Sequence, residues 1–377
     1  MEVGLRFLLV PLVSLVSISS QATESSFATL TEVNPRLAFT CKHEAIPTPT
    51  ADADLLFKYA RWLQKNNQLR RDEAVDAEVG RLYRIASEYG HSKANINLQN
   101  GAMQAQFKID GADYLRFSQQ LIKSRVATGY YYTSRFLKHG AVGLAQDPEM
   151  ALRFLRKAAD EGSAQAQYEV GEMLAPIDVA PQIARKMHRC AAEQGHGKAA
   201  VMLGIRFQME NLYSEALELF QLGVASGDEG AAGWLRRAFR NAGSNDSSDY
   251  LGQKVDLERA NRYAAIWRIL ANYSYANPTV PEINEIVPLP PAKLPEWDGK
   301  LQWLEDRLAN IPPPKPSEAL ISQLAMVKHL DPATGKPVFP GTDSAVYRVE
   351  RPRLSTLIPD SSTTRSDSTQ DLARSRP

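Results

Sequence analysis

A repeated glycine constrains the fold of this chain more than any other feature of its sequence. Five short stretches that contain alanine end in a glycine, and these glycines are Gly90, Gly129, Gly162, Gly195 and Gly227. A small side chain follows each of them four residues later, at Ala94, Thr133, Ala166, Ala199 and Ala231. A period in the thirties predicts a solenoid of stacked helix pairs, because one pair of helices cannot bury its own apolar face.

Residues 147–174 form the clearest copy of the repeat. Asp147 has a side chain that starts helices, and Pro148 suits a first helical position. Gly162 ends this helix, because glycine enters the left-handed conformation at low cost. A second helix follows, with Ala166 on the side where two helix backbones can approach closely.

These residues resemble the Sel1-like repeat, a relative of the tetratricopeptide repeat. The residues that carry the resemblance are Asp147, Ala151, Phe154, Ala158, Ala159, Gly162, Ala166, Val170, Gly171, Ala199, Leu203 and Gly204. The match is strong over residues 141–235 and degenerate over 75–140. The resemblance implies an all-α fold, a right-handed α-α superhelical solenoid with a helical, proline-punctuated C-terminal appendage.

The chain divides into five parts by composition. Residues 7–18 are apolar and precede the small residues Ser20 and Ala22, as in a secretory signal peptide, and an uncleaved N-terminal anchor is the alternative. Six prolines between 278 and 296 predict a stiff connector, and the last residues lack aromatic side chains. The expected parts are a signal peptide (1–22), an extended segment with a capping helix (23–74), the repeat solenoid (75–250), a C-terminal helical domain (251–340) and a disordered tail (341–377).

The C-terminal region resembles an uncharacterised domain attached to Sel1-like repeats in Gram-negative bacteria. The resemblance rests on residues 294–299, 315–318 and 330–335. Some secreted proteins of this type resemble periplasmic immunity proteins of type VI secretion phospholipase D effectors, which bind an incoming lipase. The resemblance therefore implies a periplasmic protein that binds and occludes a lipase effector. The alternative is an envelope scaffold or adaptor built from Sel1-like repeats.

Motifs for enzyme chemistry are absent or incomplete in the sequence. His91 and Lys93, and His196 and Lys198, match the beginning of the phospholipase D motif, but leucine stands where its aspartate is required. The other histidines are scattered, and His188 is expected to be solvated near a helix end. We therefore expect no catalytic, cofactor-binding or metal-binding residues. A net charge of +1 also argues against a nucleic-acid partner.

Cysteine is sparse in this chain. Cys41 and Cys190 are the two cysteines, and in an oxidising compartment they can form a disulfide. Two unpaired thiols are the alternative, and the sequence leaves both open.

The concave face of a solenoid is lined by the first helix of each repeat, and we expect it to bind the partner. Its outward positions should lie three, seven and ten residues after each glycine. They are Lys93, Asn97 and Asn100; Tyr132, Phe136 and His139; Gln165, Glu169 and Glu172; Lys198, Met202 and Ile205; and Gly230, Trp234 and Arg237. Protein interfaces favour Tyr, Trp, Met and Arg. Alternatively, the register is off by one, and some of these side chains face inward.

We predict that the mature chain begins near Thr23 and lies in the periplasm, because an apolar run precedes two small residues. Intact-mass measurement on the periplasmic fraction checks this prediction. A full-length chain in the cytoplasm would contradict both the export and the immunity interpretation.

Overall fold

The computed structural model describes residues 38–241 and 249–338. The expected signal peptide and C-terminal tail lie outside these residues. Within them, every regular element is a helix, apart from one isolated bridge between Leu330 and Pro337. The expected all-α class is therefore confirmed.

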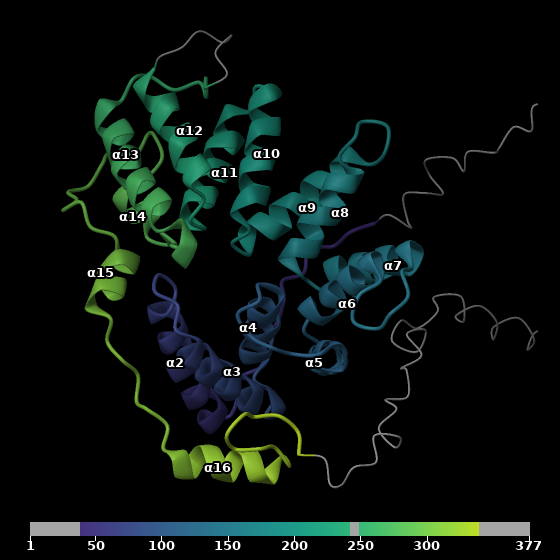
Figure 1. The fold of residues 1–377 in the computed structure, drawn as a ribbon. Helices are drawn as coiled ribbons and strands as arrows, with labels where there is room; N and C mark the ends of the chain where they lie inside the picture. The colour runs from purple at the N-terminus through teal and green to yellow at the C-terminus, as the bar shows by residue number, and fades with distance from the viewer. Residues whose placement is uncertain (1–37, 242–248, 339–377) are drawn as a thin grey trace, which may run out of the picture. The chain divides into compact units, whose positions relative to one another are not determined.

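Six helix pairs follow one another along the described chain, and each helix packs mainly against the helices next to it in sequence (Figure 1). The pairs are α2 (Ala51–Asn66) with α3 (Glu73–Glu88), α4 (Ser92–Met103) with α5 (Gly111–Lys123), α6 (Thr128–His139) with α7 (Pro148–Asp160), α8 (Ala164–Leu174) with α9 (Pro181–Glu193), α10 (Gly197–Met209) with α11 (Tyr213–Ala225), and α12 (Glu229–Arg240) with α13 (Leu257–Asn272). This sequential packing is that of a solenoid.

The same local chemistry builds four of the turns between pairs. The left-handed residue is a glycine, at Gly90, Gly162, Gly195 and Gly227. The next residue caps the following helix, and these caps are His91, Ser163, His196 and Asp228. Each cap accepts a hydrogen bond from the backbone N–H of the small residue three positions further on, at Ala94, Ala166, Ala199 or Ala231. The repeated glycine and the repeated alanine are thus two parts of one turn.

The turn between α5 and α6 differs from the prediction. Arg125 is the left-handed residue there, with φ of 59°, and Gly129 lies inside α6. Gly129 stands four residues after Arg125, where the other pairs have alanine. A Cβ on Gly129 would lie 2.6 Å from the backbone oxygen of Ser118 in α5. Glycine is needed at this position for the close approach of two helices and not for a turn.

The N-terminal segment before α2 packs along several of the inter-pair turns. Cys41 and Cys190 of α9 form a disulfide, with their Cα atoms 5.6 Å apart. Gln167 Nε2 donates to the carbonyl oxygen of Lys42 at 2.8 Å, and the Glu44 carboxylate accepts from the backbone N–H and the hydroxyl of Thr128. These contacts tie the segment to α6, α8 and α9.

The C-terminal region contains a 3-10 helix (Ser274–Ala276) and three short helices, α14 (Ile283–Ile286), α15 (Gln302–Ala309) and α16 (Glu318–Val327). The hydrophobic core is continuous across the expected domain boundary at residue 250, because α13 packs along α12. The Phe239 and Tyr263 rings of these two helices stack with centroids 5.9 Å apart.

Gly195 and Gly227 have the same backbone angle φ but different surroundings, so comparing them separates the cost of a left-handed backbone from the cost of a steric clash. Gly195 and Gly227 both have φ of 87°, but a Cβ on Gly195 would meet open space. A Cβ on Gly227 would lie 1.8 Å from the carbonyl oxygen of Pro278.

We predict that Gly195→Ala lowers the free energy of unfolding by about 1–2 kcal/mol, the cost of left-handed alanine. Gly227→Ala should cost about 2–5 kcal/mol, because overpacking of roughly 1–3 kcal/mol is added. Urea denaturation of both variants measures the difference. Equal losses of unfolding free energy in the two variants would show that the backbone at Pro278 moves away from the added methyl group at no measurable cost.

Candidate partner-binding face

The first helices of the repeats, α4, α6, α8, α10 and α12, carry all the residues predicted to face a partner. Lys93, Asn100, His139, Lys198 and Gly230 are exposed, and Asn97, Gln165, Glu169, Glu172, Met202, Ile205, Trp234 and Arg237 are half-buried. We call the first-helix face the set Lys93, Asn97, Gln165, Glu169, Glu172, Lys198, Met202, Trp234 and Arg237. Their role in binding stays a prediction.

Tyr132 and Phe136 do not face outward as expected. Their exposed fractions are 3% and 5%, and both belong to a small core cluster. The Tyr132 hydroxyl donates to Asn100 Oδ1 of α4 at 2.7 Å, and the Phe136 ring lies 5.5 Å from that of Tyr114 in α5. The positions expected on α6 assume a turn at Gly129, whereas the turn is at Arg125. Counting from Arg125 excludes Phe136 and also His139, the last residue of α6. Tyr132 stays at the seventh position, so its burial comes from its contact with α4 and not from the register.

A chain of hydrogen bonds joins three first helices. The Tyr131 hydroxyl in α6 donates to Glu169 Oε1 in α8 at 2.8 Å, and Gln165 Nε2 donates to the same oxygen at 3.0 Å. Gln165 Oε1 in turn lies 2.9 Å from His196 Nε2, at the start of α10. Burial and the Glu169 carboxylate raise the pKa of Tyr131, so that its hydroxyl remains a donor. This network holds the Glu169 carboxylate in one position. Sequence reasoning missed Tyr131, because it lies at none of the expected outward positions, whether they are counted from Gly129 or from Arg125.

A second carboxylate, that of Glu172, is held by Arg206. Arg206 Nη2 donates to Glu172 Oε1 at 3.1 Å. His188 Nε2 also lies 3.1 Å from this oxygen, without the alignment of a hydrogen bond. The His188 ring is fully buried, which corrects the expectation that it is solvated. Gly171 makes this burial possible, because a Cβ there would lie 2.6 Å from the ring.

Trp234 combines a packed side with an accessible one. Its ring stacks on the buried Phe220 ring, with centroids 5.4 Å apart and planes at 16°. The guanidinium carbon of Arg237 lies 5.1 Å from the Trp234 ring centroid, and Arg237 Nε donates to Asp249 Oδ1 at 2.8 Å. Tryptophan and arginine held in this way are the residue types that dominate binding energy in protein interfaces.

The phospholipase-like histidines serve the fold. Nδ1 of His91 and Nδ1 of His196 accept hydrogen bonds from the backbone N–H groups of Ala94 and Ala199, both at 3.1 Å. Leu98 is fully buried, as expected for a core position of the repeat. Both histidines therefore act as N-terminal helix caps, which explains their presence without a catalytic role.

Among the described residues, one cluster has side chains that could hold a metal ion, and it consists of Cys41, His43 and Cys190. Both sulfur atoms belong to the disulfide and offer no thiolate ligand. The cluster is therefore part of the N-terminal attachment.

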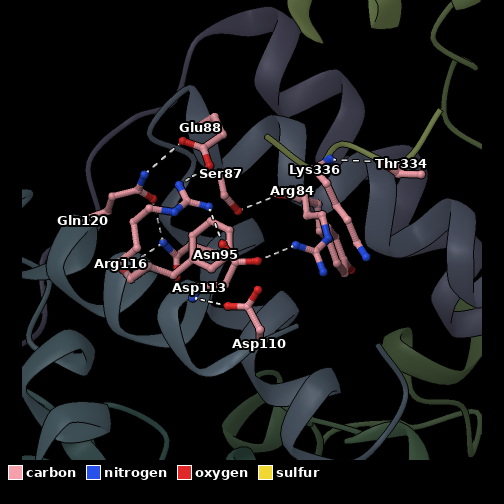
Figure 2. Close-up of polar contacts among 12 residues, drawn as sticks. Arg84, Ser87, Glu88, Asn95, Asp110, Asp113, Arg116, Gln120, Thr334 and Lys336 are labelled. Carbon is pink, nitrogen blue, oxygen red and sulfur yellow. Dashed lines mark hydrogen bonds and ion pairs between the residues drawn. The ribbon is translucent and has the colours of Figure 1, made fainter. Parts of the chain in front are cut away.

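A cavity of about 520 Å³ lies between α3, the α4–α5 loop and the turn at 333–336. Figure 2 shows Arg84 and Lys336 beside this region. Arg84 pairs with Asp113 at 3.0 Å, and Arg81 pairs with Glu318 at 2.7 Å. Because Arg84 and Arg81 already have carboxylate partners, the cavity is a weaker candidate for a binding site than the first-helix face.

Comparison with known proteins places the fold among solved structures. A domain of unknown function, DUF6396, matches residues 231–338, a range that begins inside α12. The immunity protein PA5087 of Pseudomonas aeruginosa is 25% identical, with a TM-score of 0.52, and the match covers 67% of this chain and 95% of that chain. PA5086 of the same organism gives 25% identity, a TM-score of 0.51 and the same coverage. The immunity protein PA5088 of the same organism is 24% identical, with a TM-score of 0.53, and the match covers 67% of this chain and 94% of that chain. The expected likeness to immunity proteins is confirmed. A comparison with curated proteins gives no match.

No helix among residues 38–241 and 249–338 has the length and apolar character needed to cross a membrane.

The buried His188 predicts a loss of stability in acid. Burial, together with the neighbouring Arg206, lowers the pKa of His188 from 6.5 to about 4. Between these values the unfolded chain takes up a proton that the folded chain does not, so the free energy of unfolding falls as the pH drops from about 6.5 to about 4.

We predict that His188→Gln removes up to about 3 kcal/mol of this pH-dependent change. Urea denaturation at several pH values measures the slope for wild type and variant. His139→Gln, at the exposed end of α6, is the matched control for the substitution. An unchanged slope in His188→Gln would contradict the assignment.

Proposed function

We propose that this chain is an immunity protein that binds a secreted toxin through its first-helix face. The observation that carries the proposal is its likeness to the immunity protein PA5087, which it matches over 95% of that chain at 25% identity. The first-helix face adds a physical reason, because it combines Trp234, Met202 and Arg237, residue types that protein interfaces favour.

The fixed polar groups of the face suit a protein partner. Glu169 and Glu172 are already oriented by Tyr131 and Arg206, so less side-chain entropy is lost when a partner binds. Two oriented carboxylates would accept hydrogen bonds from basic side chains of the toxin. Trp234 would supply apolar contact area at one end of the face.

The finer proposal is that the toxin is a lipase of the phospholipase D type, delivered by type VI secretion and met in the periplasm. It is supported by the resemblance carried by residues 294–299, 315–318 and 330–335, and by the signal-peptide pattern of residues 1–22. The chain would neutralise the lipase by covering its active site, and no chemistry by the chain itself is required.

We predict that Trp234→Ala and Arg237→Ala each weaken binding of the cognate phospholipase D-type lipase by at least about thirtyfold, or about 2 kcal/mol. Isothermal titration measures the affinity, and lipase activity on phospholipid vesicles measures protection. Arg268→Ala on α13, a second helix, is the exposed control.

The two variants also separate binding from folding. Trp234 packs on Phe220, so its removal lowers the melting temperature, whereas Arg237→Ala removes a half-buried ion pair and should lower it much less. Wild-type affinity in Arg237→Ala and Trp234→Ala would remove the first-helix face from the mechanism. Absence of binding by the wild type would refute the immunity function with this lipase.

A further inference from the structure

The C-terminal region contributes to two separate cores. Val280, Ile283, Val287 and Leu301 pack in the cluster built by α10 to α13, the last helix pairs. Ile321, Leu324, Ala325 and Leu330 pack in the cluster built by α2, α3 and α4, at the first pairs. The chain therefore runs from one end of the repeat array to the other (Figure 1).

The connecting residues 302–316 bury little of their own surface. α15 has no buried residue, and among residues 309–316 only Pro316 is buried and only Pro313 half-buried. This stretch therefore contributes little hydrophobic stabilisation. Any contribution of residues 302–316 to the structure must therefore come from the connection that they make between the two cores.

Aromatic rings hold the connecting segment to the last helix pair. The Arg307 guanidinium carbon lies 5.9 Å from the ring centroid of Tyr273 and 5.4 Å from that of Tyr275, both just beyond α13. It also lies 5.6 Å from the ring of Trp303 in α15. Cation–π contacts of this kind each stabilise by roughly 0.5–1 kcal/mol at exposed sites.

Polar contacts hold the other end of α15 to the first helix pair. Asn310 and Asn66 exchange two side-chain hydrogen bonds, at 2.8 and 3.1 Å. Gln68 Nε2 reaches the carbonyl oxygen of Tyr275 at 3.4 Å, which brings the first and last pairs into direct contact.

This direct contact between the two ends is weak. Its hydrogen bonds are exposed, and such bonds contribute only about 0.5–1.5 kcal/mol each. Burial, Arg61 and Arg307 lower the pKa of Lys65, so positive charges crowd this junction. The covalent connection through residues 302–316 is the stronger restraint on the distance between the ends.

Four prolines make the connection stiff. Pro312, Pro313, Pro314 and Pro316 favour an extended polyproline conformation, which rises about 3.1 Å per residue. Residues 311–316 can therefore span roughly 19 Å as a semi-rigid spacer along the first helix pair, from Asn310 beside α2 to α16 on α3. A flexible linker of the same length would allow a broad range of distances.

We propose that residues 302–316 act as a strut in which α15 joins the last helix pair to the first and the stiff stretch 311–316 fixes α15 to α16 on the first pair. The strut thereby sets the distance between the two pairs and the shape of the first-helix face. The effect on partner binding rests on the proposed function, whereas the effect on distance does not. The first-helix face spans α4 to α12, so a change in distance between its ends would change how its residues meet a rigid partner.

The test measures distance directly in the full-length protein. Spin labels on Arg70→Cys, in the α2–α3 turn, and Arg268→Cys, on α13, report the separation of the first and last pairs by electron double resonance. The strut variant carries an insertion of about 12 Gly and Ser residues, with a specific protease site, between Pro313 and Pro314. The matched control carries the same insertion between Ile177 and Asp178, in the exposed loop of the α8–α9 pair.

We expect a single narrow distance distribution in the wild type and in the control, and a broad one in the strut variant. Cleavage after folding should broaden it further, so a folding defect cannot produce the result. Pro312→Ser/Pro313→Gly/Pro314→Ser, which keeps the length but not the stiffness, should give an intermediate width. Unchanged narrow distributions in all strut variants would overturn the proposal.

The consequence for function is measured separately on the same proteins. Lipase affinity should fall at least about tenfold in the cleaved strut variant and remain at the wild-type value in the cleaved control. A broadened distance with unchanged affinity would overturn the link to binding. If the wild type binds no lipase, the proposed immunity function is refuted. The distance measurement still tests the strut proposal in that case, because it does not depend on lipase binding.

Discussion

The close approach of neighbouring helices at small residues is the constraint on which the rest of this structure depends. At each regular turn, a left-handed residue reverses the chain, a cap satisfies one free N–H, and a residue with one methyl group or none lies where two helices meet. Ala166, Ala199 and Ala231 are fully buried at these places, and Gly129 does the same task where even a methyl group would collide with Ser118. A larger side chain would separate the pairs and expose the apolar faces that hold the stack together.

A stack of repeats leaves an uncovered apolar face at each end, and this chain covers both with one C-terminal region. Ile283 completes the core of the last pairs, and Ile321 completes that of the first pairs. The match of the uncharacterised domain to residues 231–338 is consistent with this arrangement, because it begins inside α12 and includes both core-completing parts. We propose that this region closes the repeat array at both ends, since its two core-completing parts belong to different cores.

The first-helix face gains its chemistry from contacts between repeats. Glu169 is positioned by Tyr131 from the preceding pair, and Glu172 by Arg206 from the following pair. Such cross-repeat hydrogen bonds orient charged groups before a partner arrives, which lowers the entropic cost of association. They also explain why no single repeat carries a recognisable site motif, since each oriented group takes its partner from a different helix.

The sequence alone determined the local turns, because a left-handed glycine, a capping side chain and a small buried residue lie within five positions of one another, as at Gly162, Ser163 and Ala166. The sequence could not distinguish Gly129, which is needed for close helix packing, from a glycine that forms a turn, because both roles are filled by the same residue type. That ambiguity displaced the predicted position of Phe136. Only the tertiary structure decided which helix each side chain meets: His188 is buried beneath Gly171, Cys41 lies against Cys190, and Asn310 pairs with Asn66. These contacts join residues whose separation in sequence depends on how the repeats stack and close, and no local periodicity encodes that distance.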